Sequence, residues 1–158
     1  WEKLEPSTAE NLDSRFLGFW QIDRIERRMS DGQESPTAQY KQGYLIYMPS
    51  GYMAVQLVRP DRGGYDGFQP TAAEAADAMR SYVSFFGPFR VDLAEGVVVH
   101  RRDGSLNPNR VGDEVSHSFE FRDDQLILKP PPSIVEGQEV KTLVFWDRLS
   151  TVDEVVFQ

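Results

Sequence analysis

Histidine and tyrosine side chains are the groups in this sequence that could transfer a proton or hydrogen-bond a ligand. The segment 111–122 alternates in polarity, so that Val115, His117, Phe119 and Phe121 share one face while serine and glutamate side chains take the other. Because the polar face must meet water, we expect His117 to point inward among aromatic side chains. An imidazole there either completes the core with a hydrogen-bond partner or contacts a ligand and moves protons, since its ordinary pKa is about 6.5.

The second histidine, His100, lies near the end of a valine-rich segment, 97–102, and shares a face with Val98. A histidine at the mouth of a pocket would contact a ligand or take part in proton transfer. Asn109 follows Pro108 in the next loop and either supports His100 or forms a turn. We therefore treat His100 and His117 together as candidate catalytic residues, with Asn109 as a candidate ligand contact.

A β-hairpin is the clearest local structure. Residues 43–48 and 52–58 are rich in β-branched and aromatic side chains, and Gly51 in the turn between them can take a positive φ. Tyr44 and Tyr47 lie on opposite faces of the first strand, so one of them must point inward. A phenol there would donate a hydrogen bond to a ligand carbonyl or pack as a core aromatic. Tyr44 joins the histidines as a candidate catalytic residue, and Tyr47 is a candidate ligand contact.

The second strand of the hairpin supplies an apolar wall. Met53, Val55 and Leu57 share a face, and flexible methionine suits an adaptable pocket. Arg59 ends this strand and either binds a ligand carboxylate or enolate or pairs with a loop aspartate. Two aromatic residues of the histidine-bearing segment are further candidate ligand contacts: Phe119 and Phe121.

One α-helix is expected, near residues 71–86. It begins with a capping box, Thr71-Ala72-Ala73-Glu74, and should stop at Gly87-Pro88. Apolar residues recur at helical spacing: Ala75, Met79, Tyr82, Val83 and Phe86. Tyr82 and Phe86 on this stripe either cap the mouth of a pocket as ligand contacts or belong to the ordinary core.

Composition and charge narrow the class of protein. The chain has 158 residues, 40% hydrophobic and 27% charged, which is typical of one globular domain. A net charge of -8 disfavours nucleic acid and anionic membranes as partners, and the pairs Arg27-Arg28 and Arg101-Arg102 are interpreted as exposed strand-end charges. The absence of cysteine excludes disulfides and thiolate sites and fits a reducing compartment, so we expect a cytoplasmic protein.

The domain organisation is expected to be simple. Residues 1–14 are a polar arm without the pattern of a signal peptide, 15–148 form one domain, and 149–158 are a tail. No apolar run approaches the roughly 20 residues that span a bilayer as a helix. About eight strands with short turns predict an all-β, antiparallel barrel or sandwich, a choice that local patterning leaves open. The expected strands cover residues 16–28, 43–48, 52–58, 88–93, 97–102, 111–122, 125–129 and 139–148.

Three segments in this order resemble the lipocalin-like domain family of bacteria and fungi, small relatives of the calycin barrels. They are Leu17-Gly18-Phe19-Trp20 with its Gly-x-Trp; Gly43-Tyr44-Leu45-Ile46-Tyr47 followed by Gly51-Tyr52-Met53 and Arg59-Pro60-Asp61-Arg62; and His100 with Gly104-Ser105-Leu106, Pro108-Asn109 and Gly112. The resemblance implies a closed up-and-down β-barrel with the helix at one mouth. It also implies structural roles for Trp20, across the closed end, and for Arg148, which covers the indole.

Two functions are consistent with this resemblance. The first is binding of a small, largely apolar organic molecule in an internal barrel cavity of about a few hundred Å³. The alternative is a cofactor-independent isomerase or cyclase that acts on a natural-product or terpenoid-like substrate by proton transfer and shape control. A third possibility, besides these two functions, is a stability or interaction module whose interior is filled. No cofactor and no metal are expected, the expected partner is a small molecule, and the oligomeric state stays open.

Overall fold

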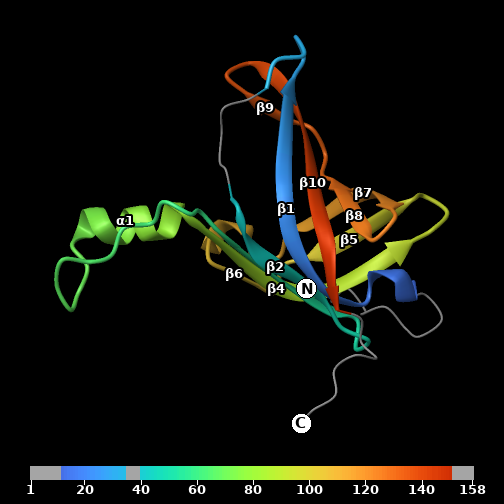
Figure 1. The fold of residues 1–158 in the computed structure, drawn as a ribbon, viewed down its shortest axis with the longest axis horizontal. Helices are drawn as coiled ribbons and strands as arrows, with labels where there is room; N and C mark the ends of the chain where they lie inside the picture. Colours follow the sequence, from blue (N-terminus) through green and yellow to red (C-terminus); the bar gives the residue numbers. More distant parts are fainter. Residues whose placement is uncertain (1–11, 35–39, 151–158) are drawn as a thin grey trace.

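An antiparallel β-sheet that closes on itself dominates the computed structural model, which describes residues 12–34 and 40–150 (Figure 1). Each barrel strand pairs with its neighbours in antiparallel fashion, and the last strand returns to pair with the first. In sheet order the eight barrel strands are β1 (Gly18–Met29), β2 (Gln42–Tyr47), β3 (Tyr52–Val58), β4 (Tyr82–Asp92), β5 (Val97–Arg101), β7 (Glu114–Arg122), β8 (Gln125–Lys129) and β10 (Gln138–Ser150).

The pairing of β1 with β10 makes the sheet a barrel rather than a sandwich. It runs from Phe19 opposite Ser150 to Met29 opposite Val140. Closure leaves no unpaired edge along that part of the sheet. The sequence expectation of a closed, all-β lipocalin-like barrel is therefore confirmed. The hairpin between β2 and β3 is also as expected, with Gly51 at a φ of 82° in its turn.

Short elements complete the fold. Two single-turn 3-10 helices, η1 (Ser14–Phe16) and η2 (Pro108–Arg110), precede β1 and β7. Two short strands attach to the barrel, β6 (Gly104–Ser105) to β4 and β9 (Ser133–Val135) to β10. The only α-helix in the described ranges, α1 (Ala72–Arg80), lies between β3 and β4 and extends away from the barrel (Figure 1).

The helix is shorter than the sequence predicted. Its capping box at Thr71 and Glu74 forms as expected, but α1 ends at Arg80. Residues 82–86 belong instead to β4, where Tyr82 pairs with Val58 of β3. The apolar residues here satisfy both a helical and an alternating spacing, and pairing with β3 decides between them.

One end of the barrel is closed by η1 and the start of β1. The Trp20 side chain is fully buried and its Nε1 donates a hydrogen bond to the Phe16 carbonyl oxygen at 2.7 Å. The Arg148 guanidinium lies 4.1 Å from the centre of the Trp20 ring. Arg148 also donates to the carbonyl oxygens of Leu17, at 3.1 Å, and Arg15, at 2.6 Å. This is the arrangement that the family resemblance implied.

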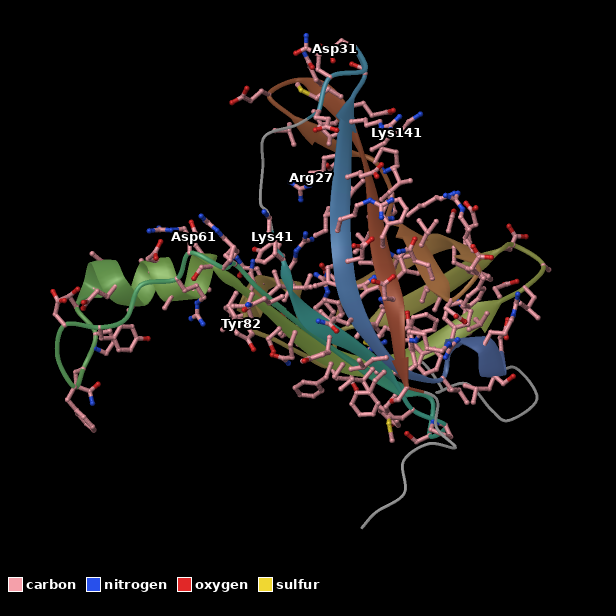
Figure 2. The ribbon with its side chains drawn as sticks, in the orientation of Figure 1. Arg27, Asp31, Lys41, Asp61, Tyr82 and Lys141 are labelled. Atoms are coloured by element: carbon pink, nitrogen blue, oxygen red, sulfur yellow. The ribbon has the colours of Figure 1, made fainter. Side chains whose placement is uncertain are left out.

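At the other end of the barrel, β1 extends well beyond its pairing with β2. β1 pairs with β2 only from Gly18 to Gln21, whereas its pairing with β10 continues to Met29. The distal half of β1 and its partner therefore rise as a two-stranded ribbon away from β2 (Figure 1). Figure 2 shows Asp31 at the tip of this ribbon, far from Lys41 at the start of β2.

The ends of the chain lie largely beyond what is described. Of the expected arm 1–14, residues 1–11 lie outside the described residues, and Ser14 begins η1. Of the expected tail 149–158, residues 151–158 lie outside them, and 149–150 end β10. Within the described ranges, no helix is long and apolar enough to cross a membrane.

The closed end predicts a specific stability effect. Arg148→Met removes the guanidinium from the Trp20 ring and from two carbonyl oxygens, so we expect the free energy of unfolding to fall by about 2 kcal/mol. The control is Arg24→Met. The Arg24 guanidinium lies 3.6 Å from the centre of the Phe145 ring and pairs with the partly exposed carboxylates of Asp23 and Glu26. That change should cost less than about 1 kcal/mol. Equal losses in urea denaturation would contradict the role given to Arg148.

Candidate functional site

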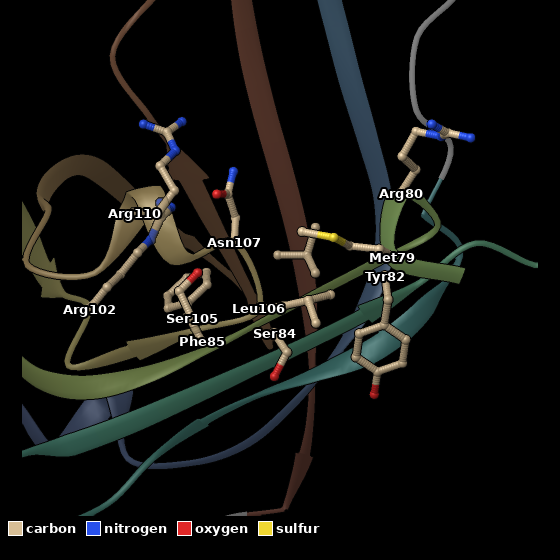
Figure 3. A pocket seen from close by; sticks show the side chains of 11 residues that line it. Met79, Arg80, Tyr82, Ser84, Phe85, Arg102, Ser105, Leu106, Asn107 and Arg110 are labelled. Atoms are coloured by element: carbon tan, nitrogen blue, oxygen red, sulfur yellow. The ribbon is translucent and has the colours of Figure 1, made fainter. Parts of the chain in front are cut away.

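A pocket of about 340 Å³ lies beside the start of β4 and is partly open to solvent (Figure 3). It is bounded by the end of α1, the start of β4, and the loop 102–113 between β5 and β7. Its apolar surface includes Val83 and Phe85, which also contact the barrel core, and Leu106 from the loop. Figure 3 shows Met79 pointing into the same space from α1. The floor of the pocket is thus formed by side chains that also pack on the barrel core.

The loop that forms one wall is attached to the barrel by its main chain. The Asp103 N–H donates to the Phe86 carbonyl at 2.9 Å, and the Leu106 N–H donates to the Ser84 carbonyl at 2.8 Å. These bonds form β6 and hold the loop 102–113 against β4. The side chains that the loop presents to the pocket are therefore held on a fixed backbone.

Below the floor, three polar rings meet inside the barrel. The Tyr47 hydroxyl lies 2.6 Å from Nε2 of His100, and the centres of the His100 and His117 rings are 4.6 Å apart. Phe85, which lines the pocket, lies with its ring centre 6.4 Å from that of His100. Tyr47 and His100 are fully buried or nearly so. The three rings form a compact polar cluster directly beneath the pocket.

Burial keeps this cluster uncharged near neutral pH. Desolvation, together with the positive charge of Arg102, lowers the pKa of His117 to about 4. Burial also lowers the pKa of His100 well below its usual value, with His117 and Arg102 acting in the same direction. The pKa of Tyr47 is raised well above its usual value, again by burial. Both imidazoles are therefore neutral near pH 7.

Each of the two histidines could form one more hydrogen bond. Nδ1 of His100 and Nδ1 of His117 are both buried without a hydrogen-bond partner among the described residues. Whether each Nδ1 donates or accepts depends on the tautomer, which for His100 is linked to the direction of the bond with Tyr47. Buried polar atoms are normally paired, so unpaired ones beside a pocket are candidates for contact with a ligand.

The structure brings together only part of the set of candidate residues. His100, His117 and Tyr47 meet inside the barrel, and Tyr82 lines the pocket. Met53 and Val55 are buried core residues, and Leu57 packs against the same core. The remaining interior candidates, Phe119 and Phe121, pack edge-on against Phe16 at ring-centre distances of 4.9 and 5.0 Å.

Other candidates lie away from this cluster. Tyr44 is 46% exposed and Phe86 58% exposed, since both project from the outer face of the sheet rather than into the barrel. Arg59 forms an ion pair with Asp61 at 2.7 Å, the alternative that the sequence left open. Asn109 is exposed on η2. The inward tyrosine of the hairpin is thus Tyr47.

Several pocket residues escaped the sequence analysis. Arg101-Arg102 was interpreted as exposed charge, which is wrong: the Arg102 side chain is only 17% exposed and lines the pocket. The signal was present, because Arg102 is two residues after His100 and therefore continues its face. Leu106 and Arg110 also line the pocket, but their orientation depends on the fold of the loop. Across residues 12–34 and 40–150, no cluster of His, Asp and Glu side chains is arranged to hold a metal ion.

Comparison with known proteins is consistent with this geometry. Residues 17–149 match the model of the lipocalin-like domain family. A relative from Aspergillus oryzae, the "4'-hydroxy-3'-methoxypropiophenone carrier protein ppsC", is 29% identical over 107 residues, which cover 61% of this chain and 96% of that protein. No solved structure matches the chain significantly.

The neutral histidines predict that acid destabilises the protein. The pKa of His117 is lower in the folded chain than in the unfolded one, so between pH 6.5 and pH 4 the unfolded chain binds more protons. The free energy of unfolding should fall across this window, by at most about 3 kcal/mol from His117. In urea denaturation at pH 6.5 and 4.5, His117→Gln should lose distinctly less stability than the wild type. Equal losses would refute the assignment.

Proposed function

The chain belongs to the lipocalin-like domain family, and from the pocket beside the start of β4 we propose that it binds and carries a small, largely apolar aromatic molecule. The observation that carries this proposal is the partly open pocket of about 340 Å³, which lies within the size range of small-molecule sites. Val83, Phe85 and Leu106 supply the apolar surface, while Ser105 and Asn107 add groups for orienting hydrogen bonds.

The ligand class is supported by the relative. Its printed name describes a carrier of an aromatic ketone with hydroxyl and methoxy substituents. A flat aromatic molecule of this size suits a pocket with an aromatic floor at Phe85 and a flexible methionine, Met79, at its side. We therefore take an aromatic ketone as the starting ligand for tests on this chain.

Proton transfer is a second candidate function, favoured by the polar cluster beneath the pocket. His117 is neutral near pH 7, partly accessible and close to His100, whose Nε2 contacts the Tyr47 hydroxyl. Such a base can take a proton from a carbon next to a ligand carbonyl while the electron pair moves to the carbonyl oxygen, and the proton can return on another atom. An isomerase or cyclase of this kind needs only side chains and a shaped pocket.

Binding in the pocket is tested with a matched pair of leucines. Leu106→Ala removes apolar surface from the pocket wall and should weaken binding of 4'-hydroxy-3'-methoxypropiophenone by about tenfold. Leu93→Ala removes the same side chain at the opposite end of β4, where Leu93 is exposed, and should leave binding unchanged. Isothermal titration calorimetry measures both affinities. Unchanged affinity in Leu106→Ala would place the ligand elsewhere.

Proton transfer is tested by hydrogen exchange of the same ketone. If His117 acts as a base, the protein should speed exchange of the methylene hydrogens next to the carbonyl with D₂O, as followed by NMR. His117→Gln should slow that exchange by about 100-fold. Tyr44→Phe, on the outer face, should leave the rate unchanged. A wild-type rate equal to that of buffer alone would remove the enzymatic alternative and leave the carrier.

A further inference from the structure

The pocket carries positive charge that its own surface does not balance. The charged side chains that line it in the described part of the chain are Arg80, Arg102 and Arg110, and none is a carboxylate. In Figure 3, Arg102 and Arg110 lie on one side of the space and Arg80 on the other. This is unexpected in a chain whose net charge is -8. Cations around an apolar floor favour an anionic group on an otherwise apolar ligand.

Arg102 is the most informative of these cations. Its guanidinium carbon lies 4.5 Å from the centre of the Phe85 ring, which forms part of the pocket floor. Its Nε is buried without a hydrogen-bond partner in the described part of the chain. Burial and the charge of Arg110 lower the pKa of Arg102, so its charge is held at a cost that a bound anion would relieve.

The nearest carboxylate does not neutralise this pair of arginines. Oδ2 of Asp113 is 3.1 Å from Nη1 of Arg110 but 3.8 Å from Nη1 of Arg102. Asp113 thus hydrogen-bonds Arg110 and lies only within ion-pair distance of Arg102. Arg102 and Arg110 thus share the single negative charge of Asp113, which leaves an excess of one positive charge at this wall of the pocket.

The preceding residue, Arg101, shows how an arginine with a structural role is paired in this chain. Arg101 lies within 3.4 Å of carboxylate oxygens from two residues, Asp103 and Glu114. Arg101 and Arg102 are consecutive, yet the first has two close acidic neighbours and the second shares one at a longer distance. This contrast indicates that the partner of Arg102 is an anion bound in the pocket.

We propose that the pocket recognises small aromatic acids, with the ligand carboxylate bound by Arg102 beside Arg110 and the ring placed against Val83, Phe85 and Leu106. This inference rests on the proposed function, because it assigns a ligand class to the same pocket. A planar guanidinium stacked on Phe85 presents its N–H groups in a fixed plane, the geometry that pairs with a carboxylate through two hydrogen bonds.

The backbone around Arg102 prepares this geometry in advance. The Arg102 N–H donates to the Asp113 carbonyl at 3.0 Å, and the Arg102 carbonyl accepts from the Gly112 N–H at 2.7 Å. Arg110 follows Pro108 in η2, a single turn closed by its own backbone. Little ordering is therefore needed when the anion arrives, which favours binding.

The test uses two ligands of nearly the same size and shape, the anion 3-phenylpropanoate and the neutral 3-phenylpropanamide. Calorimetry at physiological salt should show the acid binding at least about tenfold more tightly than the amide. Arg102→Met should reduce this ratio to near one while leaving amide affinity within about twofold of wild type. Arg90→Met, which removes one exposed positive charge outside the pocket, should keep the ratio and so controls for net charge.

A second variant tests the proposal through an expected gain in affinity. Asp113→Asn removes the competing carboxylate, so the acid should bind several-fold more tightly and the amide should be unaffected. Equal affinity for acid and amide in the wild type, or a preference that survives Arg102→Met, overturns this inference and leaves the carrier function intact. If neither these ligands nor the neutral ketone bind, the proposed function fails, and this inference fails with it.

Discussion

The antiparallel pairing of β1 with β10 is the constraint on which the rest of the molecule depends. It joins strands more than a hundred residues apart and turns an open sheet into a barrel with an inside and an outside. It also sets Arg148 opposite Trp20, so the guanidinium covers the indole at the closed end. Beyond Gln21, β1 no longer pairs with β2 and keeps β10 as its partner. Aromatic packing thus seals one end of the barrel, while the pocket lies beside the start of β4.

The polar cluster inside the barrel is costly for stability, and its position suggests why it is tolerated. Aliphatic side chains in place of His100 and His117 would bury apolar surface without unpaired Nδ1 atoms. The imidazoles instead lie neutral beneath the floor formed by Phe85, with Tyr47 bonded to one of them. Structure and function are in tension here, since a ligand or a transferred proton can use groups that the folded chain leaves unsatisfied.

The sequence pattern predicted those features that depend on local backbone and strand geometry. Alternation placed His117 inside, and Gly51 marked the hairpin turn, because both follow from strand geometry and backbone preference. It failed at Tyr82 and Phe86, whose spacing suits a helix as well as a strand until β3 is available for pairing. It also assigned Arg102 to solvent, since charge alone favours exposure, although its parity with His100 pointed inward. The pocket itself was beyond local rules, because its walls come from α1, β4 and a loop that meet only in the folded chain.

The main-chain attachment of the loop 102–113 bears on how such a protein can diversify. Amide and carbonyl groups, not side chains, tie Asp103 and Leu106 to β4. Exchanging the side chain at a position such as Leu106 therefore leaves those ties in place. Substitutions there can alter which molecule is preferred at little cost to folding, so selectivity and stability can evolve separately on this scaffold.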